Sequence, residues 1–147
     1  MSNPLPWSEN FTVGHDAVDR QHRRLVELIN EIDAALDAAK VAARLPHLLK
    51  LFRLTVEEHF RQENALLWEI KMGGYAPSPD RPRTPRYLEA MAEARFDEHM
   101  AEHAKLLTRF DEMTREPPET LGETLKAWFV DHVVKQDSHL KTIFQAL

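Results

Sequence analysis

Residues 49–70 read LKLFRLTVEEHFRQENALLWEI, and the rest of the chain is built on the same pattern. Alternating steps of three and four keep side chains on one face of a helix, and here they trace one apolar stripe. Two polar residues, His59 and Glu63, interrupt that stripe. The stretch therefore predicts an amphipathic helix that carries two potential metal ligands on its inward face.

Three other segments show the same kind of interruption. His22 begins an apolar stripe that runs to Leu36, and a later stripe from Phe96 to Met113 contains two histidines. The last stripe, which begins at Leu121, reaches a histidine and then slips out of register. The polar residues on these seams, where a helical bundle would normally place apolar side chains, are His22, His59, Glu63, His99, His103, His132 and Asp137.

Composition bounds the class of protein. The chain has 147 residues, 43% of them apolar, which predicts a single domain over residues 1–147 with one core. The net charge of −5 comes from interspersed acids and bases, so neither nucleic acid nor a membrane surface is an expected partner. There is no cysteine, which excludes disulfides, thiolate metal sites and cysteine nucleophiles. Residues 1–7 do not resemble a leader peptide, and we expect a cytoplasmic protein.

The pattern predicts an all-α, up-and-down four-helix bundle preceded by an N-terminal arm. Short connections between long amphipathic segments favour antiparallel neighbours. A Gly/Pro-rich loop separates the second and third segments. The expected elements are the arm over residues 1–17, helices over about 18–40, 45–72, 85–115 and 119–144, and the loop over 73–86.

Local signals define the helix ends. Pro46 suits the first turn of the second helix, and Gly73 with Gly74 suits its C-terminal stop. Thr84 before a proline is typical of an N-cap that opens the third helix. Thr120 has a glutamate three residues later, the spacing of a capping box for the fourth helix.

A single histidine on an apolar face is more often a hydrogen-bonded core residue than a ligand. Seven polar groups on inward seams favour a different reading, because burying one unpaired carboxylate costs several kcal/mol. A bound metal offsets that cost. His15, His47 and His139 lie off the seams, and we expect them to be solvated or to support ligands rather than to bind metal.

Ligand type and number indicate two metal ions. Imidazole and carboxylate together suit iron, manganese, zinc or copper. If Glu63 and Asp137 each bridge two octahedral ions, and an oxo or hydroxo group derived from solvent bridges them as well, the five imidazoles leave one position open. A vacancy in an apolar core suits a small diatomic ligand, and iron is the natural redox metal. A ferritin-like site is disfavoured, because no glutamate precedes a histidine by three residues.

The motifs resemble the hemerythrin family, specifically its single-domain bacterial members, the bacteriohemerythrins. The resemblance covers the arm with Trp7 and Phe11, the segment ending at His22, and all the later ligand positions in order. It implies a non-heme protein with two iron ions (Fe²⁺/Fe³⁺) that binds dioxygen reversibly. By this resemblance the first iron is held by His99, His103 and His132, the open-site iron by His22 and His59, and Glu63 and Asp137 bridge them.

The fourth helix departs from regular geometry. His132 and Asp137 are five residues apart, which is about 140° on an ideal α-helix. The apolar stripe shifts by one residue in the same interval. We therefore predict a one-turn π-bulge between His132 and Asp137, a feature found at functional sites.

The connection between the second and third helices is also unusual. Glu63 and His99 are 36 positions apart, whereas the family uses roughly half that distance, so this hairpin looks extended. We expect the extension to project past the metal site. Its larger side chains are predicted either to cap the site or to form a weak homodimer surface, the residues concerned being Trp68, Met72, Tyr75, Tyr87 and Met91.

Three functions remain open from the sequence. The leading one is storage, delivery or scavenging of dioxygen without catalysis, because no acid, base or nucleophile set accompanies the ligands. A sensor or adaptor acting through the long hairpin is the second. An enzyme acting on peroxide or nitric oxide is the third, and it would need a proton donor such as Tyr75, Tyr87 or His15.

Overall fold

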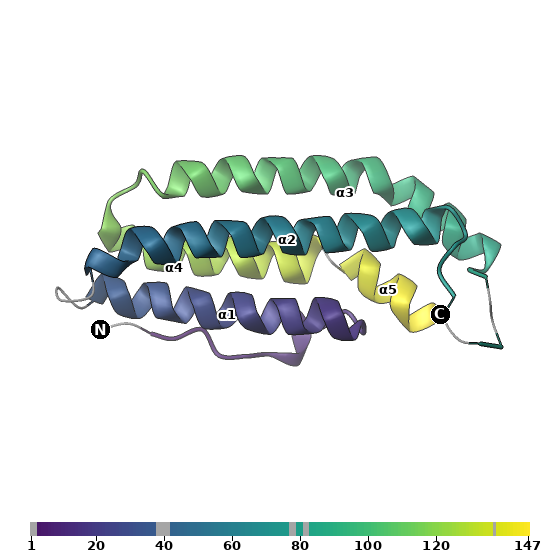
Figure 1. Cartoon of the computed structure of the whole chain (residues 1–147), viewed down its shortest axis with the longest axis horizontal. Coiled ribbons are helices and arrows are strands. Elements are labelled where there is room, and N and C mark those ends of the chain that lie inside the picture. The colour runs from purple at the N-terminus through teal and green to yellow at the C-terminus, as the bar shows by residue number, and fades with distance from the viewer. Residues whose placement is uncertain (1–2, 38–41, 77–78, 81–82, 137) are drawn as a thin grey trace.

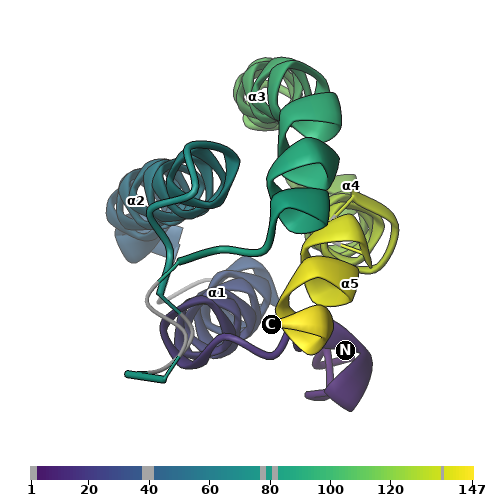
Figure 2. The ribbon, with the colours of Figure 1, turned by 90° about the vertical axis from the view of Figure 1, so that its right-hand side faces the viewer.

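The structure, a computed structural model, describes residues 3–37, 42–76, 79–80, 83–136 and 138–147. Four long helical segments run side by side along the long axis (Figure 1), and the end view places them around a common centre (Figure 2). The prediction of an all-α up-and-down bundle is therefore confirmed. The elements are η1 (Glu9–Phe11), α1 (Asp16–Asp37), η2 (Ala42–Arg44), α2 (Leu45–Lys71), α3 (Arg86–Met113), α4 (Pro118–Val130), η3 (Asp131–Gln136) and α5 (Ser138–Ala146).

Two of the predicted helix ends are confirmed. Pro46 lies in the first turn of α2, where its missing N–H costs no helical hydrogen bond. Gly73 has φ +76°, a left-handed conformation that suits glycine, and it ends α2. The N–H of Gly74 then donates to Glu69 O at 2.9 Å.

The two predicted threonine caps are wrong. Thr84 does not cap α3, because its hydroxyl donates to the carbonyl of Tyr75 at 2.7 Å and ties the two sides of the loop together. Thr120 lies inside α4, which begins at Pro118, and its hydroxyl donates to Pro117 O at 3.1 Å. Proline at the start of α4 supplies a preset φ, so that helix begins before the polar residues of the expected capping box.

Two apolar cores lie along the bundle. The larger contains Leu25, Phe52, Phe110 and Phe129 with their neighbours. The smaller core is formed by Val13, Val18, Leu66, Leu67, Ile70, Leu88, Ala92, Leu140 and Ile143.

Each long helical segment passes from one core to the other through the predicted ligands. In α2, for example, Val56 belongs to the larger core, His59 and Glu63 follow, and Leu66 belongs to the smaller core. The polar layer is therefore enclosed from both ends of the bundle by apolar side chains.

The smaller core corrects one expectation about the hairpin. α2 and α3 do extend beyond the ligand layer, but α5 packs beside their extension instead of leaving it free (Figure 1). The cap is supplied by this core, since Trp68, Met72, Tyr87 and Met91 are 49%, 61%, 60% and 37% exposed. The capping role predicted for those four residues is wrong, whereas Tyr75, the fifth residue of that prediction, does pack against the smaller core. Their role as a homodimer surface stays a prediction, as does the extension relative to the family.

No helix in the described part of the chain is both long enough and apolar enough to cross a membrane.

Close approach of α1 and α4 depends on Gly122. A Cβ at this position would lie 2.4 Å from Oδ1 of Asp33, a buried carboxylate that accepts a hydrogen bond from Lys126. The carboxylate is held by that bond, so it has little freedom to move away.

Replacing this glycine by valine (G122V) is expected to destabilise the protein. Overpacking of this kind typically costs about 1–3 kcal/mol, and we expect about 2 kcal/mol in the free energy of unfolding from urea denaturation. Ala127 lies exposed on the same helix, and A127V should change stability by no more than about 0.5 kcal/mol. Equal effects of the two variants would contradict the packing argument.

Candidate metal centre

The ligand layer is organised around one carboxylate. Oε1 of Glu63 lies 2.6 Å from Nε2 of His59 and 3.6 Å from Nε2 of His22. Oε2 lies 3.1 Å from Nε2 of both His99 and His103. The two oxygens of one side chain thus face two different pairs of histidines, and all five side chains are buried.

The remaining two predicted ligands differ in what the structure shows. His132 is also buried, and its Nε2 lies 3.9 Å from Oε1 of Glu63. Its ring lies 5.4 Å from that of His103 and 6.1 Å from that of His59, between the two groups. Asp137 is outside the described residues, so its predicted bridging position is not placed by the structure.

The outer nitrogens of three histidines meet protein oxygens. Nδ1 of His22 is 2.6 Å from Phe11 O, and Nδ1 of His59 is 2.8 Å from Oε1 of Gln21. Nδ1 of His103 is 2.9 Å from Oδ1 of Asn64. An oxygen acceptor requires a proton on Nδ1, which leaves the lone pair of Nε2 directed into the cluster.

Charge states also suit metal binding. Burial by itself raises the pKa of Glu63, but the surrounding imidazoles, with His59 the strongest, bring it well below its ordinary value. Burial lowers the pKa of His103 to about 4, despite the opposing effect of the nearby carboxylate. At neutral pH the carboxylate is therefore ionised and His103 is neutral, the forms that bind metal.

Two buried atoms at the centre lack hydrogen-bond partners. They are Oε1 of Glu63 and Nε2 of His99. A buried polar atom without a hydrogen bond lowers the stability of the fold. Here both atoms are of the kind that binds metal, and both lie in the ligand layer. Two sets of ligand atoms could each hold an ion, one from His22, His59 and Glu63 and the other from Glu63, His99 and His103. The donor set therefore fits two cations that share Glu63.

The predicted π-bulge is confirmed. Residues 131–136 form a π-helix, η3, between α4 and α5. The wider turn inserts one residue into the helical repeat, which absorbs the shift of the apolar stripe. As a result Trp128 and Val133 pack in the larger core while Leu140 packs in the smaller one.

The family follows from this geometry together with a comparison of the sequence. Residues 13–144 match the model of the hemerythrin HHE cation-binding domain. The chain belongs to the hemerythrin family. No curated protein and no solved structure gives a significant match. A hemerythrin domain binds metal through such a histidine and carboxylate cluster, and the buried layer described above is where this hemerythrin chain carries one.

The sequence pattern did not find the residues that support the ligands. Gln21 directly precedes His22, and Asn64 directly follows Glu63. Both therefore lie beside the inward seams rather than on them. His139 contacts the predicted ligand His99, which is one of the two roles expected for a histidine that lies off the seams. His15 instead accepts from the N–H of Val18 at 3.4 Å at the start of α1, and His47 is exposed.

Asn64 offers a direct test of these supporting contacts. Substitution by alanine (N64A) removes the oxygen that fixes the ring of His103, and loss of such a partner typically weakens metal affinity about 10–100-fold. Titration with Co²⁺ should show this loss at one of two sites. The neighbouring variant Q62A, which changes a partly exposed residue of α2, should bind as the unmodified protein does.

Proposed function

We propose that this protein binds dioxygen reversibly at a non-heme di-iron centre, for storage, delivery or scavenging. The observation that carries the proposal is the position of Glu63, whose two carboxylate oxygens face separate histidine groups 2.6–3.6 Å away. A single carboxylate in this position suits a bridge between two ions better than a ligand to one.

Each ligand has a proposed role. His99, His103 and His132 would hold one iron and His22 and His59 the other, with Glu63 and Asp137 as the carboxylates that they share. Two ferrous ions with a solvent-derived bridging oxo or hydroxo group would supply the electrons and the open coordination position that reversible oxygen binding needs. That position would belong to the iron held by only two histidines.

The surroundings support carriage over catalysis. On the two-histidine side, the ring of Phe129 lies 6.2 Å from that of His22. The ring of Phe60 borders both groups, because it lies 5.9 Å from that of His59 and stacks on that of His103 at 3.9 Å. The nearest polar partners, Gln21 and Phe11 O, are engaged in orienting the ligands. An apolar wall excludes water and slows proton transfer to a bound ligand, which favours release of unchanged oxygen. We accordingly propose a binding protein and not an enzyme.

The test is optical. Iron-loaded protein, reduced under anaerobic conditions, is exposed to oxygen and then purged with argon. We expect an oxygen-dependent visible charge-transfer band that purging removes over repeated cycles. Direct conversion to a stable oxidised spectrum would refute carriage and favour sensing or redox catalysis.

The cellular setting is part of the same proposal. We place the protein in the cytoplasm, with dioxygen as its partner. Its proposed oligomeric state is a monomer or a weak homodimer. Trp68 of α2, Met72 directly after α2 and Tyr87 of α3 are exposed near the end of the hairpin, where the predicted dimer contact would lie. Sedimentation of the full chain and of W68E/M72E distinguishes the two states, since only a dimer that uses this surface would dissociate.

A further inference from the structure

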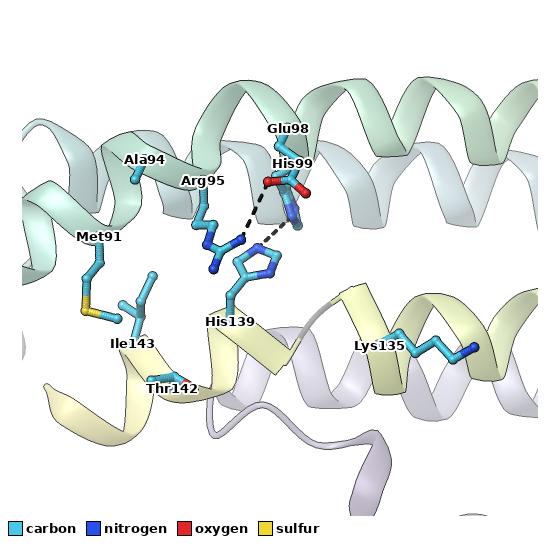
Figure 3. Close-up of a pocket in the computed structure, with 9 residues that line it drawn as sticks. All are labelled: Met91, Ala94, Arg95, Glu98, His99, Lys135, His139, Thr142 and Ile143. Atoms are coloured by element: carbon cyan, nitrogen blue, oxygen red, sulfur yellow. Dashed lines mark hydrogen bonds and ion pairs between the residues drawn. The ribbon is translucent and has the colours of Figure 1, made fainter.

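A pocket opens beside one of the buried histidines. It lies between α3 and α5 and has a volume of about 530 Å³. Figure 3 shows His139 projecting from α5 toward His99 on α3, with Arg95 and Met91 along the α3 side. The pocket is large enough for a small molecule, and His99, one of the residues that line it, belongs to the ligand layer.

His139 makes the contact that closes the pocket toward the cluster. Its Nε2 lies 3.0 Å from Nδ1 of His99, and the two rings meet edge to face with centroids 5.0 Å apart. His99 is only 3% exposed, whereas His139 is partly accessible. The pair therefore spans the boundary between the buried layer and the pocket.

This contact differs from those of the other outer nitrogens described above. Phe11 O, Gln21 Oε1 and Asn64 Oδ1 are oxygens that accept a proton. A ring nitrogen of histidine either donates or accepts, depending on its tautomer. The outer nitrogen of His99 thus meets another histidine, while those of the other three meet a backbone or amide oxygen.

We propose that His139 is a positioning residue for the metal centre. By accepting a hydrogen bond from Nδ1–H of His99, it keeps Nε2 of His99 unprotonated and directed into the ligand layer, where Glu63 Oε2 lies 3.1 Å away and both atoms could bind one ion. This inference rests on the proposed metal centre, because it concerns how one ligand is held for an ion. It assigns a function to a residue that lies off the apolar seams.

The helix break explains how a residue of α5 reaches this position. His139 is seven residues after His132, which on a regular helix would place both on nearly the same face. The π-helical turn of η3 lies between them and rotates α5 relative to α4. His132 therefore lies 3.9 Å from Glu63 Oε1 while His139 approaches α3 from the pocket side.

The experiment compares three variants by Co²⁺ titration, followed through the visible spectrum of the bound ion. H139L removes the acceptor and should weaken one of the two sites about 10-fold or more, the usual effect of losing a ligand's outer partner. H139Q retains an acceptor oxygen and should bind closer to the unmodified protein. H47L changes an exposed histidine of α2 and serves as the matched control.

Chemical rescue separates positioning from packing. Because the pocket adjoins His139, added imidazole should occupy the space left in H139A and restore affinity and the Co²⁺ spectrum, with no such gain in the unmodified protein or H47L. Unchanged binding in H139L overturns the inference. Weak binding in H139L that neither imidazole nor the glutamine variant restores also overturns it, because that result describes a packing role.

A measurement without metal distinguishes this inference from the proposed function. In the metal-free protein, ¹⁵N NMR should show the proton of His99 on Nδ1, and H139L should redistribute it toward Nε2. A wild-type protein that fails to bind two Co²⁺ ions overturns the di-iron proposal even where the tautomer result holds. Two-ion binding with an unaffected His99 tautomer in H139L overturns only the role of His139.

Discussion

Replacing Glu63 by leucine is expected to destabilise the metal-free protein and to abolish its stabilisation by metal. Without an ion, the imidazoles around the fully buried Glu63 hold the pKa of its carboxyl low, so the ionised form stabilises the fold. E63L should lose about 1–3 kcal/mol, because the buried histidines are left without their acceptor. With metal, the unmodified protein should gain about 2.7 kcal/mol per site at a free concentration 100 times Kd. E63L has lost the shared ligand and should gain little.

Urea denaturation with and without Co²⁺ measures both effects. The expected result is a large stabilisation of the unmodified protein by Co²⁺ and little or none of E63L, which is also the less stable protein without metal. E58L changes an exposed glutamate of the same helix, 64% accessible and paired with Arg61, and should keep the full response to metal. Equal metal stabilisation of E63L and the unmodified protein would rule out Glu63 as the shared ligand.

The sequence predicted the bundle because its signals are periodic. Apolar residues repeat along each segment at helical spacing, and the polar interruptions stand out against them, as His59 and Glu63 do in α2. The π-bulge was predictable for the same reason, since a one-residue slip in a regular stripe requires an extra residue in the helix. The family was predictable from the order of these motifs, and residues 13–144 match it.

Other features could not be predicted because they depend on contacts between segments. Asn64 and Gln21 are ordinary polar residues until α3 and α2 bring His103 and His59 against them. The threonine caps failed since Thr84 bonds across the loop to Tyr75, a partner nine residues away that local capping rules do not consider.

The hairpin shows the same limit on a larger scale. Its helices were predicted to run past the ligands, but the sequence did not indicate what would cover them. Leu140 and Ile143 of α5 complete the smaller core there, so the cap comes from the last helix and not from Trp68 or Met72, which face solvent. Predicting this cap from the sequence would require the direction of α5, and that direction depends on the break in the helix at η3.

A second large effect is expected from the buried ion pair between α1 and α4. Nζ of Lys126 donates to Oδ2 of Asp33 at 2.9 Å and to Asn3 O at 2.6 Å, so one ammonium group joins both helices and the N-terminal arm. The two side chains of the pair are only 9% and 11% exposed. K126M leaves the carboxylate of Asp33 without its cation in this setting.

Breaking such a pair from one side costs about 3–5 kcal/mol. Because both side chains keep a small exposure, we expect K126M to lose about 3 kcal/mol in urea denaturation. The double variant D33L/K126M removes both charges and should recover most of that loss, because the cost comes from the unpaired carboxylate and not from the absent attraction. E123Q alters the other partner of Lys126, whose side chain is 77% exposed, and should change stability by no more than about 0.5 kcal/mol. If the double variant were as unstable as K126M, the loss would instead arise from the packing of the lysine stem and its hydrogen bond to Asn3, and the ion pair would not be what joins α1 to α4.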